Sequence, residues 1–416
     1  MSTNVKDPVV VVGAGIIGVC CALYLLREGH RVILVDRGAP GEGTSFGNGS
    51  IITEEAVVPV QSPGIAWQVP GMLMDPLGPL ALRWSYLPQI APWLFQFIRA
   101  SSPERVEEVS IALKALLKGA LTAYDPLLEV AGIRDMIRRS GWVSVYETEA
   151  GFKRHGPKLE LQRRRGVKLE VLQPEELRQL EPSLAPIFHR GVLYPEVAHT
   201  VNNFRFVTEL AATFLHLGGD IRRQAVVGFE QGDGGVRAVV TEAGSLACSG
   251  VVIAAGAWSK SLATMLGSRP LLDTERGYHL TLPHAGVELR LPVYSTEHGF
   301  VCTPLETGLR VAGTVELGGL EAAPNWQRAD VLYRNAGRWL PGLDGREKSL
   351  WMGYRPSMPD SLPVIGRSPR HRNAIFAFGH GHIGLSLGAR TGSLVAALLA
   401  EREPGIDMAP YRVDRF

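Results

Sequence analysis

Cysteine is scarce in this sequence, with four residues among 416. Cys20, Cys21, Cys248 and Cys302 form no CxxC pair and no spacing typical of a metal site. A disulfide scaffold, a zinc centre or a dithiol reductase is therefore disfavoured, and we predict no bound metal. A reducing compartment suits this pattern.

An excess of one charge sign is also missing. The 43 Lys and Arg residues nearly balance the 41 Asp and Glu residues, so the formal net charge is +2, and no long run of like charge occurs. We therefore predict no nucleic-acid partner, because such proteins carry a basic patch or arm. Glycine, by contrast, is abundant, with 47 of the 416 residues against a usual share of about 7 per cent. The length predicts two to three domains at about 150 residues each.

One long apolar run lies near the N-terminus. Val9 to Leu26 carries no charge, and its length would suit a transmembrane helix or the core of a signal peptide. However, Gly13, Gly15 and Gly18 interrupt the run at GxGxxG spacing, a single lysine precedes it, and no small-residue cleavage site follows. A buried strand, a tight turn and a buried helix explain the same hydropathy better.

The glycine motif lies between two predicted strands, 8–12 and 31–35, and opens a helix over 19–28. In this arrangement the first glycine makes a tight turn, the second lets the backbone approach a pyrophosphate, and the third lets helix and strand pack closely. The helix N-terminus supplies free N–H groups to the phosphates. Asp36 ends the second strand, where a carboxylate can accept hydrogen bonds from ribose hydroxyls. The pattern predicts a dinucleotide site.

The residues after Asp36 bear on which dinucleotide binds. A nicotinamide dehydrogenase would continue in alternating strands and helices, whereas this chain enters a glycine-rich stretch, residues 38–50. Thr44, Ser45 and Asn48 suit the wrapping of a longer cofactor with hydroxyl and backbone donors. This favours FAD, while an ordinary surface loop stays open as the alternative.

Five segments together resemble a known family. They are VVVVGAGIIGVCCALYLLREGHRVILVDR (9–37), TSFGNGS (44–50), VVIAAGAWS (251–259), WMGYRPSMPDSLPVIG (351–366) and FAFGHGHIGLSLGARTGSLVAALL (376–399). In this order they resemble the FAD-dependent D-amino acid oxidase and dehydrogenase superfamily, and within it the bacterial D-amino acid dehydrogenases, including the D-hydroxyproline dehydrogenase type. The resemblance implies an α/β fold in which a Rossmann-like FAD-binding domain is interleaved with an α+β substrate domain built on a mixed antiparallel sheet.

The resemblance also implies domain limits. The FAD domain would be discontinuous, comprising residues 1–60, 200–268 and 345–416, and the substrate domain would comprise 61–199 and 269–344. Periodicity predicts helices over 103–130, 202–217 and 384–400, and strands over 224–230, 236–242, 246–255 and 374–378.

Two stretches of unusual composition remain. Residues 61–100 are rich in Pro, Trp, Leu and Met, and the recurrent proline argues against a membrane span. They form either buried irregular structure or an exposed apolar patch that contacts a bilayer or a partner, and burial is favoured because soluble proteins seldom expose contiguous apolar surface. Residues 153–170 are strongly charged and indicate a solvated helical surface.

Oxidation of an amino acid at its α-carbon needs a cation for the carboxylate and positive potential near the flavin N1. The resemblance places the carboxylate-binding arginine at Arg355, whose guanidinium fork can make two parallel hydrogen bonds. The loop Gly379–Gly384 opens a helix whose N-terminus can point at the flavin N1–C2=O edge. His380 and His382 in this loop have no nearby carboxylate or cysteine that would favour a metal.

Three further residues are candidates for the substrate pocket. The segment around Tyr278 and His279 resembles the family's loop over the pocket, where the tyrosine hydroxyl could donate to the substrate carboxylate or amine. A tyrosine packed at a strand start is the alternative. His199 is a candidate for the pocket wall, or else a loop histidine with a local hydrogen bond.

The motifs and the resemblance imply one set of cofactor contacts. They are Gly13, Ala14, Gly15, Ile16, Ile17, Gly18, Asp36, Arg37, Thr44, Ser45, Asn48, Gly49, Val226, Val227, Ala255, Gly256, Trp258, Gly353, Gly379, His380, Gly381, His382, Ile383 and Gly384. Covalent attachment in relatives uses a histidine after the second strand or a cysteine near the later arginine segment. This chain has no histidine between 31 and 150, and Gly353 and Tyr354 stand at the latter place, so we predict noncovalent FAD.

The function implied is oxidation of a D-amino acid to the imino acid by hydride transfer to flavin N5. Apolar or cyclic substrates such as D-proline and cis-4-hydroxy-D-proline are favoured. The alternatives are a glycine- or sarcosine-type secondary-amine oxidase and a flavin-containing RNA-modifying or binding module. The acceptor would be a quinone of the respiratory chain or O2. The enzyme would be cytoplasmic, with peripheral contact to the inner face of the membrane through residues 61–100.

Overall fold

A six-stranded sheet gathers strands from three separate stretches of the chain, as the computed structural model shows for residues 7–61, 75 and 77–416. Its spatial order is β10 (Asp220–Arg223), β2 (Val32–Asp36), β1 (Val9–Val12), β14 (Gly250–Ile253), β21 (Ala374–Phe378) and β20 (Val364–Arg367). The pairings are parallel except that of β20 with β21. Four apolar β-branched side chains make β1 fully buried, as a central parallel strand requires.

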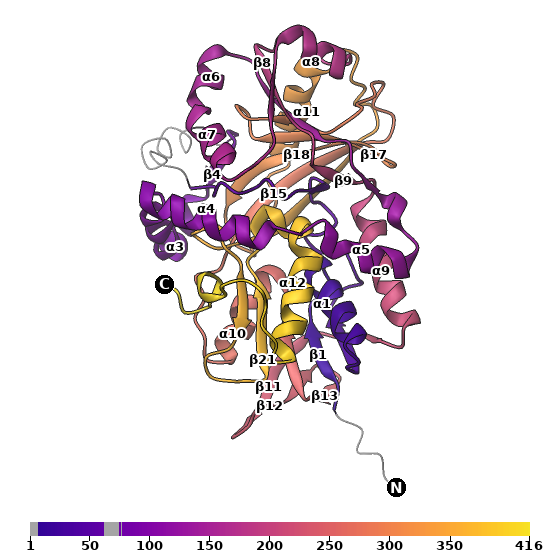
Figure 1. Cartoon of the computed structure of the whole chain (residues 1–416), viewed down its shortest axis with the longest axis vertical. Helices are drawn as coiled ribbons and strands as arrows, with labels where there is room; N and C mark the ends of the chain where they lie inside the picture. The colour runs from indigo at the N-terminus through magenta and orange to yellow at the C-terminus, as the bar shows by residue number, and fades with distance from the viewer. Residues whose placement is uncertain (1–6, 62–74, 76) are drawn as a thin grey trace.

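Three helices pack around this sheet. α1 (Ile16–Arg27) lies beside α12 (Gly384–Leu399) and also contacts α9 (Asn203–His216), so helices from near the two ends of the sequence pack together (Figure 1). The apolar run 9–26 is therefore β1, a turn and the buried helix α1. One stretch within the described part, Gly381–Leu399, is long and apolar enough to cross a membrane, but most of it is buried in the fold.

A larger sheet fills the upper part of Figure 1. Its order is β19 (Ser349–Ser357), β15 (Asp273–Leu282), β18 (Gly308–Leu317), β17 (Phe300–Leu305), β16 (Val293–Ser295), β6 (Trp142–Tyr146), β8 (Arg190–Tyr194) and β7 (Glu170–Leu172), with β4 (Leu80–Leu82) paired to β18. Most pairs are antiparallel, but β16–β6 and β18–β4 are parallel. The predicted mixed antiparallel sheet is thus confirmed. α11 (Gln327–Trp339) packs on one face through Leu332, Ala336 and Trp339.

Two three-stranded sheets complete the strands. One contains β11 (Val226–Gly232), β12 (Gly235–Thr241) and β13 (Gly244–Ala247), and the other contains β3 (Ile51–Ile52), β9 (Ala198–Thr200) and β5 (Ile137–Arg138). The prediction of a single strand over 246–255 is wrong. It is two strands, because β13 pairs antiparallel with β12 whereas β14 enters the parallel sheet.

The remaining helices are short, apart from α3 and α4. They are α3 (Leu87–Arg99), α4 (Pro103–Leu117), α5 (Asp125–Ala131), α6 (Glu149–Arg154), α7 (Gly156–Arg164), α8 (Pro174–Leu180) and α10 (Ser259–Met265). The helix predicted over 103–130 is interrupted after α4, where Gly119 has φ +77°. The charged stretch 153–170 contains the end of α6, all of α7 and the residues that follow, and it exposes most of its charges, as predicted.

The expectation of burial over 61–100 fails in part. Residues 62–74 and 76 lie outside the described residues. On α3, Ile90 and Trp93 are buried, but Phe95 and Ile98 are 61% and 50% exposed. The domain limits stay a prediction, although β19, which lies within 345–416, pairs with β15 in the larger sheet.

Candidate active site

A cavity of about 500 Å³ lies where the two large sheets meet. The carboxyl end of β1, the N-terminus of α1, the middle of β19 and the loop before α12 border it. Of the cofactor contacts predicted from sequence, those that line it are Gly13, Ala14, Gly15, Ile16, Ile17, Asp36, Arg37, Thr44, Ser45, Asn48, Val226, Ala255, Gly256, Trp258, Gly353, His380, Gly381 and Gly384.

The first glycine motif leaves no room for side chains. Gly13 has φ +110°, and a Cβ there would stand 2.3 Å from the carbonyl oxygen of Ala254. A Cβ on Gly18 would stand 1.7 Å from the carbonyl oxygen of Gly13, so this glycine serves packing and does not itself line the cavity. Gly15 caps α1 without a side-chain hydrogen bond, which leaves the positive end of the helix facing the cavity.

The wall near β2 carries the predicted ribose acceptor. Asp36 already accepts hydrogen bonds from the backbone N–H groups of Ala14 (2.7 Å) and Gly38 (2.9 Å), and a carboxylate has further lone pairs for a hydroxyl. The guanidinium of Arg37 stacks 3.9 Å from the centre of the Trp258 ring. This end of the cavity therefore combines one acceptor with a flat aromatic wall.

The loop 44–50 turns only part of its surface to the cavity. The hydroxyl of Thr44 donates to the carbonyl of Tyr354 (2.7 Å), and that of Ser45 accepts from the N–H of Ile16 (2.9 Å). Gly49 faces away, because its carbonyl accepts from Thr303 and a Cβ would stand 3.0 Å from Val301. Gly49 therefore does not line the cavity, and its contact with the cofactor stays a prediction.

Val227 does not line the cavity either, and its predicted contact with the cofactor stays a prediction. Neighbouring residues of a strand point to opposite faces, so Val226 lines the cavity while Val227 is 49% exposed.

The loop before α12 presents two histidines in different settings. His380 is buried, its Nε2 lies 3.0 Å from the Thr391 hydroxyl, and burial lowers its pKa to about 3. Surrounding protein and the charges of Arg355 and Lys158 lower the pKa of His382 to about 4, although its ring keeps an exposed edge. Gly379 and Ile383 lie in the same loop but do not line the cavity, and neither does His382. Nowhere in the described part of the chain do three His, Cys, Asp or Glu residues gather as metal ligands.

Arg355 lies on β19 between Tyr354 and Pro356, both of which line the cavity. Its side chain is half-buried, and its Nη1 donates to the carbonyl of Thr314 (2.9 Å). The guanidinium lies against Gly277 of β15, where a Cβ would stand 2.3 Å from its Cζ atom. Burial lowers the pKa of Arg355, while Glu275 opposes that shift, and the guanidinium stays charged.

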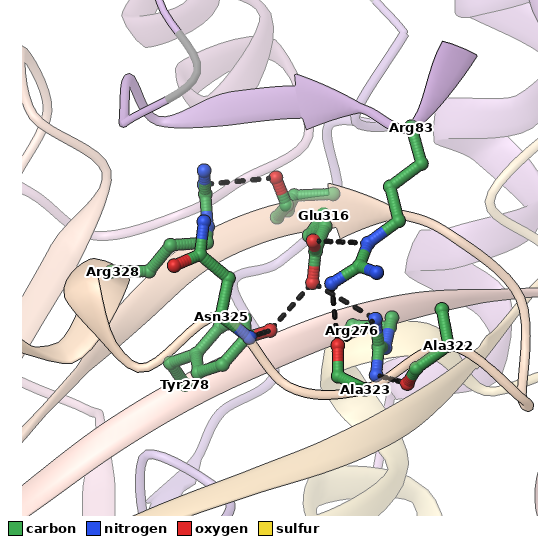
Figure 2. A network of polar contacts seen from close by, with 9 residues as sticks. Arg83, Arg276, Tyr278, Glu316, Ala322, Ala323, Asn325 and Arg328 are labelled. Carbon is green, nitrogen blue, oxygen red and sulfur yellow. Dashed lines mark hydrogen bonds and ion pairs between the residues drawn. The ribbon is translucent and has the colours of Figure 1, made fainter. Parts of the chain in front are cut away.

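Tyr278 is not brought together with Arg355. Its hydroxyl donates to Glu316 (2.5 Å) and accepts from the N–H of Asn325 (2.9 Å). Figure 2 shows Arg83 and Arg276 on the same carboxylate. Burial and Glu316 raise the pKa of Tyr278 to about 12. Tyr278 lies on the face of β15 that packs with α11, which favours the alternative of a packed tyrosine, and its contact with the substrate stays a prediction.

His279 and His199, the other two predicted histidines, also form contacts with neighbouring residues. His279 stacks on Trp351 with ring centres 5.0 Å apart, its Nδ1 lies 3.2 Å from the carbonyl of Gly47, and its pKa is lowered to about 3 by burial and Arg310. His199 is buried in β9, its Nδ1 lies 3.0 Å from the Ser140 hydroxyl, and burial lowers its pKa to about 4. Neither side chain lines the cavity, and the roles of His279 and His199 toward the substrate stay predictions.

Several residues around Arg355 escaped prediction. Glu275 and Tyr294 interact electrostatically with its guanidinium, and Thr314 holds it by a carbonyl. Thr314 has φ +58°, a conformation that β-branched residues rarely adopt. No local pattern indicates these residues, because they come from β15, β16 and β18 and meet only through strand pairing.

Comparison with known proteins agrees with this geometry. A family model described as FAD dependent oxidoreductase matches residues 8–398. The chain is 41% identical to a D-amino-acid oxidase of Bradyrhizobium diazoefficiens and 33% identical to a D-amino acid dehydrogenase of Paramagnetospirillum magneticum, each over 98% of both chains.

Solved structures show the same fold. Glycine oxidase from Geobacillus kaustophilus superposes with a TM-score of 0.77 at 21% identity, over 99% of this chain and 100% of that one. L-Proline dehydrogenase from P. horikoshii superposes with a TM-score of 0.76 at 20% identity, over 99% and 98%. These likenesses confirm the predicted fold class.

The cavity itself fits FAD. The turn at Gly13 admits no side chain, the N-terminus of α1 borders the cavity, and the cavity extends from Arg37 and Val226 to Trp351 and the loop before α12. Since the family model and the full-length relatives agree with this geometry, the chain belongs to the FAD-dependent oxidoreductase family.

Proposed function

We propose that this enzyme oxidises a D-amino acid at its α-carbon to the imino acid. The full-length relatives named for D-amino acids support this substrate class. The observation that carries the proposal is the half-buried guanidinium of Arg355 beside the FAD cavity. FAD held there noncovalently supplies the chemistry, since it accepts the α-hydrogen as hydride.

Arg355 binds the substrate carboxylate in this proposal. A guanidinium fork makes two charge-assisted hydrogen bonds with a carboxylate, which fixes the orientation of the α-carbon. Gly277 leaves space for the fork, and the Thr314 carbonyl holds one of its N–H groups. The positive end of the helical segment at Gly381–Gly384 faces the cavity and favours negative charge there.

The substrate amine is neutral when the hydride leaves. Burial and the charge of Arg355 lower the pKa of His382 to about 4, so this imidazole is neutral at physiological pH. His380 is occupied by Thr391. Proton loss from the substrate in solution is therefore sufficient, and no protein base is assigned.

The first experiment is an anaerobic screen of D- and L-amino acids for bleaching of the flavin spectrum. We expect bleaching by at least one D-amino acid, and its absence for all of them would refute the substrate class. With the best substrate, Arg355→Ala should raise the Michaelis constant at least about 30-fold and leave FAD affinity unchanged, since a charge-assisted pair contributes about 2 kcal/mol or more. An unchanged Michaelis constant would refute the role of Arg355.

Apolar or cyclic D-amino acids are the substrates we favour. Tyr294, which interacts electrostatically with Arg355, stacks on Trp142 with ring centres 5.3 Å apart, and this aromatic pair suits an apolar side chain. The screen should therefore rank D-proline and cis-4-hydroxy-D-proline above D-aspartate. Faster turnover of glycine or sarcosine would favour the secondary-amine oxidase alternative. A comparison of the turnover rates with O2 and with a quinone as the electron acceptor separates an oxidase from a dehydrogenase.

We also propose that the exposed face of α3 contacts the cytoplasmic face of a membrane, where a quinone acceptor is accessible. Trp84, 65% exposed, precedes the helix, and Phe95 and Ile98 continue the same apolar face. No Asp or Glu occurs between residues 84 and 102, and Arg99 stacks near the Phe95 ring at 5.9 Å. An apolar face edged by arginine suits an anionic lipid surface.

The test is sedimentation with phosphatidylglycerol–phosphatidylcholine vesicles. The wild type should co-sediment, and the double variant Trp84→Ser/Phe95→Ser should stay in the supernatant with its dye-coupled activity intact. Equal sedimentation of both proteins would refute this surface. Concentration-dependent dimerisation without vesicle binding would assign the face to a second copy instead.

A further inference from the structure

A buried arginine that is not among the predicted site residues contacts the loop 46–49, which lies beside the FAD cavity. Arg310 is on β18, opposite Thr281 of β15 and Thr303 of β17, and its side chain is 6% exposed. Its Nη1 donates to the carbonyl oxygens of Phe46 (2.9 Å) and Asn48 (3.1 Å). Asn48 itself lines the FAD cavity. One side chain thus ties the larger sheet to the cavity wall.

The charge of this guanidinium has no anionic partner among the residues that the structure describes. Its hydrogen bonds go to carbonyl oxygens only, and its Nε atom has no partner in that part of the chain. Burial lowers the pKa of Arg310 to about 10, with no carboxylate opposing the shift, so the group stays protonated at neutral pH. Buried charges are normally paired because desolvation is costly, and a neutral amide would suffice to hold two carbonyls.

The larger sheet supplies two further anchors for the same loop, and both are neutral, while Nδ2 of Asn203 on α9 also donates to the carbonyl of Asn48 (2.8 Å). The carbonyl of Gly47 accepts from Nδ1–H of His279 (3.2 Å), and that of Gly49 accepts from the Thr303 hydroxyl (2.9 Å). His279 is neutral because its pKa is lowered to about 3. Four consecutive carbonyls of the loop 46–49 are therefore held by the larger sheet, and only Arg310 adds a charge.

We propose that Arg310 has two roles toward FAD, as a positioning residue for the loop 46–49 and as the source of a fixed positive charge that raises the reduction potential of the flavin. Two-electron reduction of a flavin adds negative charge to its ring system. A cation in a low-dielectric surrounding stabilises that charge more than water does. The proposal concerns the cofactor of the family and does not depend on which amino acid is the substrate.

Three variants separate the two roles. Arg310→Gln keeps an amide donor for the loop carbonyls and removes the charge, whereas Arg310→Lys keeps the charge and loses the fork. Thr303→Val removes a neighbouring anchor of the same loop without any change of charge. Arg134→Gln, at an exposed arginine on the surface, controls for the change in net charge.

The readouts are the dissociation constant for FAD, from reconstitution of the apoprotein, and the midpoint potential of the saturated holoenzyme against reference dyes. We expect a negative shift of the potential in Arg310→Gln with FAD binding close to the wild type, because the amide donor is kept, and little shift of the potential but about tenfold weaker FAD binding in Arg310→Lys, which loses the fork. Thr303→Val should weaken FAD binding without a shift of potential, and Arg134→Gln should change neither quantity.

Three results would overturn the proposal. An unchanged midpoint potential of the flavin in Arg310→Gln would refute the electrostatic role. An equally large negative shift in Arg310→Lys would also refute it, since lysine keeps the charge. Wild-type FAD affinity in Arg310→Lys, which loses the fork, would refute the positioning role.

Discussion

Replacing Gly277 with alanine tests the placement of Arg355 without touching the arginine itself. A Cβ at this position would stand 2.3 Å from Cζ and 2.7 Å from Nη1 of Arg355, well inside van der Waals contact. Gly277 has no positive φ, so the backbone of β15 accepts alanine without strain. The clash therefore falls on the mobile end of the Arg355 side chain, which must move out of its place over the strand.

We expect the Gly277→Ala substitution to weaken substrate binding and to leave the folding stability nearly unchanged. Alanine is favoured over glycine within a strand by roughly 0.5–1 kcal/mol, which limits any loss of thermal stability. Loss of a charge-assisted contact to the carboxylate costs about 2–4 kcal/mol, which corresponds to roughly 30- to 700-fold in kcat/KM. FAD affinity should stay at the wild-type value, because Gly277 does not line the cavity.

The assay is steady-state kinetics with the best D-amino acid, with thermal unfolding and FAD titration alongside. Gly366→Ala is the matched control, since it is also a glycine of a strand and a Cβ there meets no atom within 4 Å. In an Arg355→Ala background, Gly277→Ala should cost almost nothing more, as expected for two residues that act through one contact. Wild-type kcat/KM in Gly277→Ala, or a full additional loss in the double variant, would refute the reasoning.

Three further predictions concern the rest of the molecule. Glu316→Ala, at the centre of the network in Figure 2, should lower the free energy of unfolding by about 3–5 kcal/mol in denaturant titrations, whereas Tyr278→Phe should cost about 1 kcal/mol and leave the Michaelis constant unchanged. Burial raises the pKa of Glu55 from 4.5 to about 8, so the folded state binds the extra proton and the free energy of unfolding should fall as pH rises from about 4.5 to 8. Glu55→Gln should flatten that part of the pH profile, and an unchanged profile would count against the shift. Gly13→Ala should abolish FAD retention, because its Cβ would overlap the Ala254 carbonyl; a yellow, fully loaded variant would contradict this.

Local features of the sequence were sufficient for the elements that touch FAD. The strand over Ala374–Phe378 and the helix that follows from Gly384 were predicted with the bounds that the structure shows within a residue. The turn at Gly13 was likewise predictable, because its steric demands come from neighbours within one βαβ unit. The position of Arg355 came from a motif, although its role stays a prediction.

The pairing of strands that are distant in the sequence decided where the other predicted site residues lie. Tyr278 and His279 are adjacent in sequence, yet one joins Glu316 and the other holds the loop at Gly47, because neighbouring residues of a strand face opposite sides.

By itself, the sequence determined the glycine turn with its flanking strand and helix, since these follow from short-range sterics and hydrophobic period. FAD as the cofactor and the interleaved α/β architecture came from the resemblance of five segments to a known family. Only the tertiary structure decided that Arg355 lies over Gly277 and that Arg310 donates hydrogen bonds to the loop 46–49. These contacts join residues 41 to 264 positions apart or sit across paired strands, and strand register, which fixes them, depends on the packing of the whole sheet.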